Sequence, residues 1–301
     1  MSVLPPFAGI STALYTPFHP NGRVDEGAFA ALCDRVASAG SGLVPCGTTG
    51  ETPTLSDGEY LDVVRIAVDV AAGRVPVIAG TGGASTEKTV AATAKVKELG
   101  VDAALVVTPP YNRPPQVSLL AHFRAVADVG LPVVLYNVPA RTGTNLLPET
   151  TLALAADPRF VAIKEACGNI GQIDLLVERA PERFAILSGD DSMTLPLLAV
   201  GGHGLISVVA NVAPRACVAM VNAGLAGDLE RARAAHRALV PLIRALFATS
   251  SPIPLKHVAA QLGHCTPTVR LPLTADAVGA ELSAELRRAM EAVQRFEETL
   301  G

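Results

Sequence analysis

Short apolar segments alternate with longer segments of helical periodicity from the N-terminus to about residue 208. Most of the apolar segments are continuous rather than alternating, which is typical of parallel strands buried on both faces. Eight predicted strands follow: residues 10–16, 42–45, 75–78, 103–107, 133–137, 161–164, 184–187 and 204–208. Apolar side chains recur at helical spacing between the first of them, at residues 27–38, 56–72, 86–99 and 116–129.

Eight strands that alternate with helices predict an α/β fold, the closed (β/α)8 TIM barrel, with a doubly wound open sheet as the alternative. After the eighth strand only helical patterns continue, at residues 214–226, 228–247, 253–262 and 275–299. These helices exceed the needs of one barrel unit. We therefore predict a barrel at residues 1–226 and a helical C-terminal region at residues 227–301 that packs on it.

Polar residues at the predicted helix starts support these boundaries. Ser56 and Glu59 fit a capping box, in which each side chain binds the backbone N–H of the other residue. Ser85 or Thr86 is suited to cap the helix that starts near residue 86.

The composition restricts the classes of protein. Half of the 301 residues are hydrophobic and 17% are charged, which is enough apolar material for a large core. The net charge is −4 and no basic run occurs, so no nucleic-acid partner is expected. The uncharged residues 192–214 contain prolines and glycines, which favour a buried helix, a turn and a strand over a membrane span.

Two further features concern the cellular compartment. The N-terminus has no basic region followed by an apolar core, so no secretory signal is expected. The five cysteines are scattered and form no CxxC pair. Such thiols are typical of a reduced, cytoplasmic protein.

Active sites of such barrels lie at the carboxyl ends of the strands, so polar residues there are candidates for chemistry. Only five of the 24 basic residues are lysines, and Lys164 ends the apolar run at residues 160–163. It is either an ion-paired or snorkelling lysine or an amine nucleophile. A lysine must be neutral to attack a carbonyl, and burial favours the neutral form.

Three further candidates lie at neighbouring strand ends. Tyr136 ends the fifth strand and is either a core residue or a proton shuttle, since Schiff-base formation requires a donor to expel water. The GTTGE sequence at residues 47–51 follows the second strand and is either a simple turn or a loop that binds a carboxylate. Arg141 suits a surface salt bridge or bidentate capture of a carboxylate.

Two polar motifs favour structural roles. His203, in the GGHG sequence, has no His, Asp or Glu neighbours at metal-ligand spacing, so we expect a structural residue. Asp190 and Asp191 could form a metal pair, but the helical pattern at residues 192–200 favours a helix N-cap. No metal site is therefore expected.

Six motifs in order give the chain a family resemblance. They are GTTGE at residues 47–51, TPPYN at 108–112, YNVP at 136–139, IKEA at 163–166, SGDD at 188–191 and GGHG at 201–204. Together they resemble the dihydrodipicolinate synthase / N-acetylneuraminate lyase family of class I aldolase-like enzymes, over nearly the whole chain.

The resemblance implies a site that forms a Schiff base with pyruvate on Lys164. Tyr136 matches the residue that moves protons at the adduct, with Thr48 and Tyr111 as relay partners. Tyr111 would reach across a subunit interface, since family members are commonly homotetramers built as dimers of dimers. Neither a metal nor an organic cofactor is implied, nor is a membrane.

The remaining family positions bind substrate. Thr49 matches a residue that binds the pyruvate carboxylate, and Gly189 and Ile206 match backbone contacts around pyruvate. Arg141 matches the arginine that binds the carboxylate of L-aspartate 4-semialdehyde. It favours the subgroup that condenses this aldehyde with pyruvate, a lyase-type activity (EC 4.3.3.7) of the diaminopimelate and lysine pathway.

Two alternatives remain open at this point. One is an aldolase or dehydratase of the same family acting on a 2-keto-3-deoxy sugar acid or N-acetylneuraminate. The other is a barrel that binds keto acids without catalysis.

The resemblance also bears on feedback by lysine. The positions that match the lysine-binding cleft of inhibited relatives are Asp57, Ala84, Lys88 and Pro110. Lys88 would place a cation where an amino group should bind. We therefore expect insensitivity to lysine.

Overall fold

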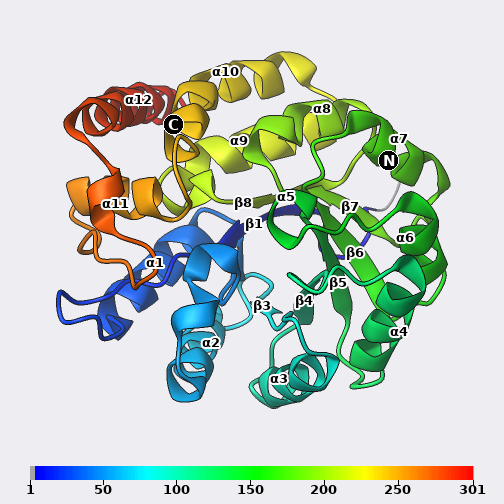
Figure 1. Ribbon diagram of the computed structural model, residues 1–301. Coiled ribbons are helices and arrows are strands. Elements are labelled where there is room, and N and C mark those ends of the chain that lie inside the picture. Colours follow the sequence, from blue (N-terminus) through cyan, green and yellow to red (C-terminus); the bar gives the residue numbers. More distant parts are fainter. Residues whose placement is uncertain (1–3, 301) are drawn as a thin grey trace.

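The computed structural model describes residues 4–300, with a barrel of eight parallel strands at its centre (Figure 1). The strands are β1 Gly9–Ala13, β2 Gly42–Val44, β3 Ile78–Gly80, β4 Ala103–Val107, β5 Val133–Asn137, β6 Phe160–Glu165, β7 Ala185–Ser188 and β8 Gly204–Ser207. Hydrogen-bonded neighbours follow the order β2-β1-β8-β7-β6-β5-β4-β3.

The two ends of this order meet and close the barrel. The amide of Leu43 on β2 donates to the carbonyl oxygen of Pro76 at 2.8 Å, and Leu43 forms a parallel bridge with Val77. The predicted (β/α)8 barrel is therefore confirmed, and the open doubly wound sheet is excluded.

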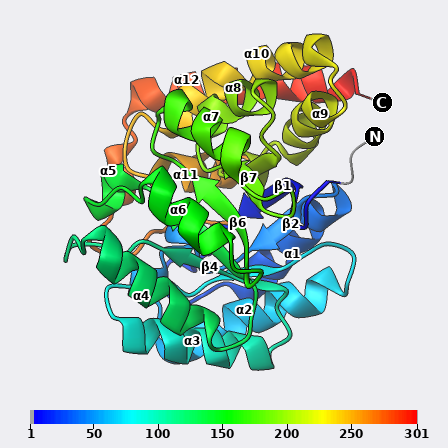
Figure 2. The same cartoon turned by 90° about the vertical axis from the view of Figure 1, so that its right-hand side faces the viewer.

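Helices surround the strands on all sides in both views (Figures 1 and 2). They are α1 Glu26–Ser38, α2 Asp57–Ala71, α3 Thr86–Glu98, α4 Gln116–Ala127, α6 Pro148–Ala155, α7 Ile170–Arg179, α8 Thr194–Ala199 and α9 Pro214–Leu225. The short helix α5 Pro139–Thr142 lies in the loop after β5. The capping box of Ser56 and Glu59 is formed, and Ser85 caps α3.

The C-terminal helices pack beside the barrel. They are α10 Leu229–Leu246, α11 Ile253–Gln261 and α12 Ala280–Glu298. Helix α10 contacts α9 and α12, and it continues through Pro241. The carboxylate of Glu297 on α12 accepts from the amide of Ala216 at 2.8 Å. The helix expected from residue 275 begins instead with a 3-10 turn, Ala275–Ala277, and restarts after Gly279.

The core has two layers because strand side chains alternate in direction. On β5, Val134 and Tyr136 belong to the cluster inside the barrel, whereas Val133 and Leu135 pack with the cluster under the helices. The continuous apolar pattern of the strands reflects this double burial. Lys164 has the same parity on β6 as Ala162, which lies in the inner cluster. Its side chain therefore points into the barrel.

Two strands differ from the prediction at their ends. The first ladder ends at Ala13 because the side chain of Asn211 accepts from the amide of Tyr15 at 3.2 Å. The third strand lies later than expected, at Ile78–Gly80 rather than residues 75–78. Pro76 accepts a hydrogen bond there but has no N–H to continue the ladder.

No helix among residues 4–300 has the length and apolar character needed to cross a membrane.

Candidate active site

Lys164 and Tyr136 lie side by side at the carboxyl ends of β6 and β5. They are direct register partners in the parallel ladder, and both side chains point inward. The Lys164 Nζ lies 4.4 Å from the centre of the Tyr136 ring. Both residues are buried, with exposed fractions of 4% and 7%. The strand register thus brings an amine and a phenol into one site, as the sequence predicted.

The Lys164 amine has no charged partner in the part of the chain that the structure describes. Within residues 4–300, no carboxylate lies within 4.0 Å of its Nζ, so the ion-paired alternative is wrong. Gly189 after β7 makes room for the lysine stem. A Cβ there would lie 2.9 Å from Lys164 Cγ and 3.0 Å from Ala166 Cβ.

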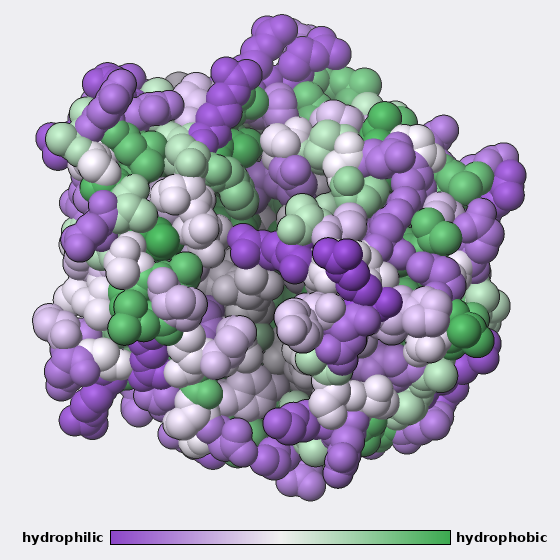
Figure 3. Space-filling view, viewed as in Figure 1, coloured by the Kyte–Doolittle hydropathy of each residue, from purple (hydrophilic) through white to green (hydrophobic). Residues whose placement is uncertain are grey.

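A cavity of about 500 Å³ adjoins this pair on the side of Tyr136. Its lining includes Thr48, Tyr136, Val138 and Arg141. The volume is in the range of small-molecule sites. The face of the molecule in Figure 3 is hollowed near its centre, with hydrophilic and hydrophobic residues around the hollow. Lys164 does not itself line the cavity, but its amine lies over the ring of Tyr136, which does.

Arg141 stands at the rim of this cavity on α5 and is exposed. No carboxylate within the described chain lies within 4.0 Å of its guanidinium, so the surface salt bridge considered above is not formed. An unpaired guanidinium at a cavity rim is suited to bind an acidic substrate.

The loop after β2 is a tight 3-10 turn over Thr48–Gly50. Thr48 is exposed toward the cavity, and Thr49 is buried with 5% exposed. The amides of Gly50 and Glu51 donate to the carbonyl oxygens of Gly47 and Thr48. These two amides are therefore not free to bind a carboxylate, and only the start of the loop keeps that capacity.

The other residues expected in the site are more dispersed. Ile206 on β8 is fully buried in the inner cluster of the barrel. Tyr111, after β4, is 92% exposed and does not line the cavity of its own chain. Its φ of 73° lies in the left-handed region, which is unusual for a residue other than glycine.

A buried polar network that the sequence analysis missed lies directly behind the pair. Asn137 Nδ2 donates to both carboxylate oxygens of Glu165, at 3.0 and 3.1 Å. Gln172 and the amide of Cys167 donate to the same carboxylate. Burial raises the pKa of Glu165. Since these residues follow Tyr136 and Lys164 in the chain, the network ties the ends of β5 and β6 together.

The residues that were expected to have structural roles form hydrogen bonds with nearby backbone amides. His203 precedes β8, at the opposite end of the barrel, and its Nδ1 accepts from the amide of Ile186 at 3.0 Å. Asp190 accepts from the amide of Ser192 at 2.8 Å and thus caps a 3-10 turn, Asp191–Met193, which leads into α8 in place of an α-helix from residue 192. Asp191 is buried and accepts from Ser207 and from the amide of Val208. No cluster of three or more potential metal ligands occurs in residues 4–300.

Comparison with known proteins decides the family. The sequence profile described as the dihydrodipicolinate synthetase family matches residues 6–293. This chain belongs to that family. A relative from Hyphomonas neptunium, called 4-hydroxy-tetrahydrodipicolinate synthase, is 52% identical over 288 residues, 94% of this chain and 98% of the relative. One of the same name from Thermomicrobium roseum is 51% identical over 267 residues, 88% of each chain.

The solved structures agree with the sequence relatives. The crystal structure of dihydrodipicolinate synthase from Aquifex aeolicus is 43% identical and has a TM-score of 0.92. The match covers 96% of this chain and 98% of that one. The similarity thus extends over the barrel and the C-terminal helices together.

Proposed function

We propose that this protein is a 4-hydroxy-tetrahydrodipicolinate synthase, which condenses pyruvate with L-aspartate 4-semialdehyde. The observation that carries the proposal is the buried amine of Lys164, which pairs with no carboxylate in residues 4–300 and lies against the ring of Tyr136. The names of the relatives and the family support the same activity. No specific observation favours the sugar-acid alternative.

The first half of the proposed reaction takes place on Lys164. The neutral amine attacks the keto carbon of pyruvate, and water leaves to give an imine. Tyr136 donates the proton that the departing hydroxyl needs. Tyr136, deprotonated by that step, then takes a proton from the methyl carbon, and the C–H electron pair moves into the protonated imine to give an enamine. In this proposal Thr48 and Tyr111 connect Tyr136 to solvent as a proton relay.

The second half forms the carbon–carbon bond. The enamine carbon attacks the aldehyde of the semialdehyde, whose carboxylate binds Arg141. The amine of that substrate then displaces Lys164 and closes the ring, which returns the lysine to its free form. In this proposal Thr49 binds the pyruvate carboxylate, and the backbone at Gly189 and Ile206 contacts the pyruvate unit.

The assembly and the cellular setting are parts of the same proposal. Tyr111 is exposed and outside its own cavity, so a relay through it requires a neighbouring copy of the chain. As the family resemblance implies, we propose a homotetramer of two dimers, and we place it in the cytoplasm. We also propose residues 1–226 and 227–301 as barrel and C-terminal region.

The proposed function is tested by comparing turnover of pyruvate plus aspartate semialdehyde with a panel of 2-keto-3-deoxy sugar acids and N-acetylneuraminate. We expect product only from pyruvate plus aspartate semialdehyde. Arg141→Ala should lower kcat/KM for the semialdehyde about 10- to 100-fold, since a hydrogen bond to a charged group contributes about 1.5–3 kcal/mol.

Two results would contradict this assignment. Faster turnover of a sugar acid than of aspartate semialdehyde would show that the semialdehyde is not the second substrate. If Arg141→Ala lowered imine formation with pyruvate as much as it lowers kcat/KM for the semialdehyde, the arginine would not have the proposed role. The matched control is Arg124→Ala on α4, an exposed arginine that does not line the cavity, which should leave kcat/KM unchanged.

A further inference from the structure

The C-terminal region contacts the loop that carries Thr48 and Thr49 through a buried ion pair. Lys256 on α11 places its Nζ 2.7 Å from the Oε1 of Glu51, the residue that ends the loop. The two side chains are 0% and 2% exposed. The Lys256 Nζ also lies 4.0 Å from the centre of the Phe18 ring. The pair therefore lies in the interior, shielded from solvent and salt.

The second oxygen of Glu51 is also occupied. It accepts a hydrogen bond from the backbone amide of Arg270 at 2.9 Å. Glu51 has a φ of 54°, in the left-handed region that residues other than glycine rarely adopt. Its own amide closes the 3-10 turn on Thr48 at 3.1 Å. Two contacts from the C-terminal region thus hold the side chain of a backbone-strained residue at the end of the turn.

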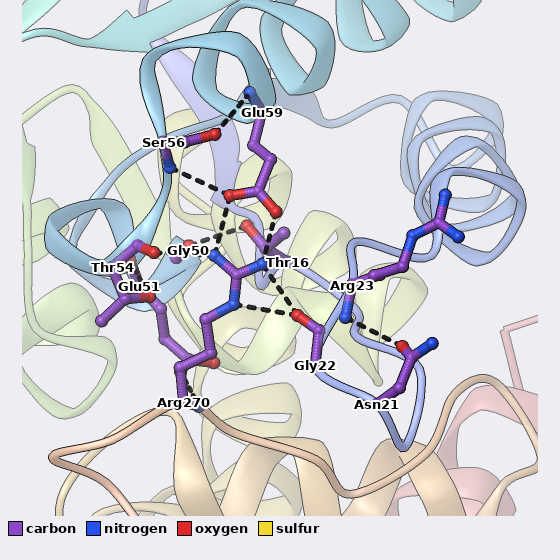
Figure 4. Close-up of polar contacts among 10 residues, drawn as sticks. All are labelled: Thr16, Asn21, Gly22, Arg23, Gly50, Glu51, Thr54, Ser56, Glu59 and Arg270. Atoms are coloured by element: carbon purple, nitrogen blue, oxygen red, sulfur yellow. Dashed lines mark hydrogen bonds and ion pairs between the residues drawn. The ribbon is translucent and has the colours of Figure 1, made fainter.

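The side chain of Arg270 extends this support to the surrounding segments (Figure 4). Its guanidinium donates twice to the carbonyl oxygen of Gly22, once to that of Thr54, and to both carboxylate oxygens of Glu59. All five N–H donors of the arginine are therefore used. Arg270 lowers the pKa of Glu59 to about 2, chiefly through the hydrogen bonds between them.

The front of the loop has much less support. Within the described chain the hydroxyl of Thr48 forms no hydrogen bond with protein atoms, and its side chain faces the cavity. The loop is otherwise held through backbone carbonyls, by Thr16 on Gly50 and by Thr52 on Gly47. The position of the Thr48 hydroxyl therefore depends on the path of the backbone between Gly47 and Glu51.

We propose that Glu51, Lys256 and Arg270 are positioning residues that set the place of the Thr48 hydroxyl relative to Tyr136. This inference rests on the proposed function, because it assigns Thr48 to the proton relay. Displacement of a reacting group by about 1 Å can lower a rate about 100-fold. The C-terminal region then contributes to catalysis through the loop and not only to stability.

The central test is a double-mutant cycle between Glu51→Gln and Thr48→Val, read as kcat at saturating substrates. Glu51→Gln should lower kcat about 10- to 100-fold in the wild-type background. In the Thr48→Val background the same change should lower kcat less than threefold, because its effect passes through the missing hydroxyl. If Glu51→Gln lowered kcat by the same factor in both backgrounds, its effect would not pass through Thr48, and the proposal would be overturned.

A second variant separates positioning from stability. Glu51→Gln leaves Lys256 buried without its counter-charge and should lower the melting temperature. The double change Glu51→Gln with Lys256→Met removes both charges, and should recover most of the melting temperature while kcat stays low. Recovery of kcat together with the melting temperature would make the pair purely structural and overturn the proposal.

Two controls complete the experiment. Asp62→Asn on α2 alters an exposed carboxylate that pairs with Arg65 and contacts neither Arg270 nor the turn, and should change kcat less than twofold. Borohydride trapping with pyruvate should reach the same final extent in Glu51→Gln as in wild type, although more slowly, because Lys164 itself is held by β6 and only the proton relay is displaced. Wild-type protein that traps no pyruvate would overturn the proposed function itself, whereas normal trapping with multiplicative losses would overturn only the positioning role.

Discussion

Two buried lysines in this protein lie in similar surroundings but have different partners. Lys164 and Lys256 are 4% and 0% exposed, and each amine lies over an aromatic ring, at 4.4 Å from Tyr136 and 4.0 Å from Phe18. Lys256 also has a carboxylate at 2.7 Å, whereas Lys164 has none within 4.0 Å in residues 4–300.

The difference explains why only one of these amines is suited to covalent chemistry. A carboxylate stabilises the ammonium form and opposes the loss of a proton that nucleophilic attack requires. Burial lowers the pKa of Lys256, and the charge and hydrogen bond of Glu51 offset this lowering only in part. The ring under the Lys256 amine, Phe18, also lacks a hydroxyl, so that ring cannot move protons as Tyr136 can. Burial alone therefore does not make a nucleophile.

The largest effect is expected when the hydroxyl that distinguishes the two ring partners is removed. Tyr136→Phe keeps the ring beside Lys164 but removes its proton donor. Acid–base catalysis by one side chain contributes about 10²–10⁴ in rate, so kcat should fall by that factor. Steady-state kinetics measure it, and a loss below threefold would contradict the role of Tyr136.

The next effect concerns stability and separates the paired lysine from the unpaired one. Lys256→Met leaves Glu51 as a buried charge without its counter-charge, and should lower the free energy of unfolding by about 3–5 kcal/mol. Lys164→Met removes a buried amine that pairs with no charge, and should change that free energy by less than about 1 kcal/mol. Urea unfolding followed by circular dichroism measures both. Equal losses would show that the two lysines are not distinguished by their partners.

The smallest change in turnover is expected when free lysine is added, because we predict no feedback inhibition. The family resemblance predicts such a cleft at Asp57, Ala84, Lys88 and Pro110, and Ala84 and Pro110 line the cavity beside Thr48. Lys88, in the first turn of α3, is exposed and adds a cation near this surface. Millimolar lysine should leave turnover within experimental error in a coupled assay. Half-maximal inhibition at that concentration would contradict the expectation.

Local sequence signals predicted the barrel and the residues at its strand ends. The strand pattern placed Tyr136 and Lys164 at the ends of neighbouring strands, and the ladder register pairs them directly. The shift of β3 came from Pro76, whose missing donor interrupts the ladder within an apolar run.

Long-range pairings could not be predicted in the same way. The contact between Glu51 and Lys256 joins positions 205 residues apart, and Lys256 reads in the sequence as an ordinary helix residue. The hydrogen bonds between Asn137 and Glu165 depend on which side chains point outward from adjacent strands. Such contacts follow from the closed barrel and not from the local pattern.

The most direct test of the central claim is borohydride reduction in the presence of pyruvate, followed by intact mass and peptide mapping. The account predicts one reduced pyruvate per chain, attached to Lys164, and none on Lys256. Lys164→Met should abolish the adduct. An unmodified wild-type chain, or an adduct that maps to Lys256 or to a surface lysine, would contradict it.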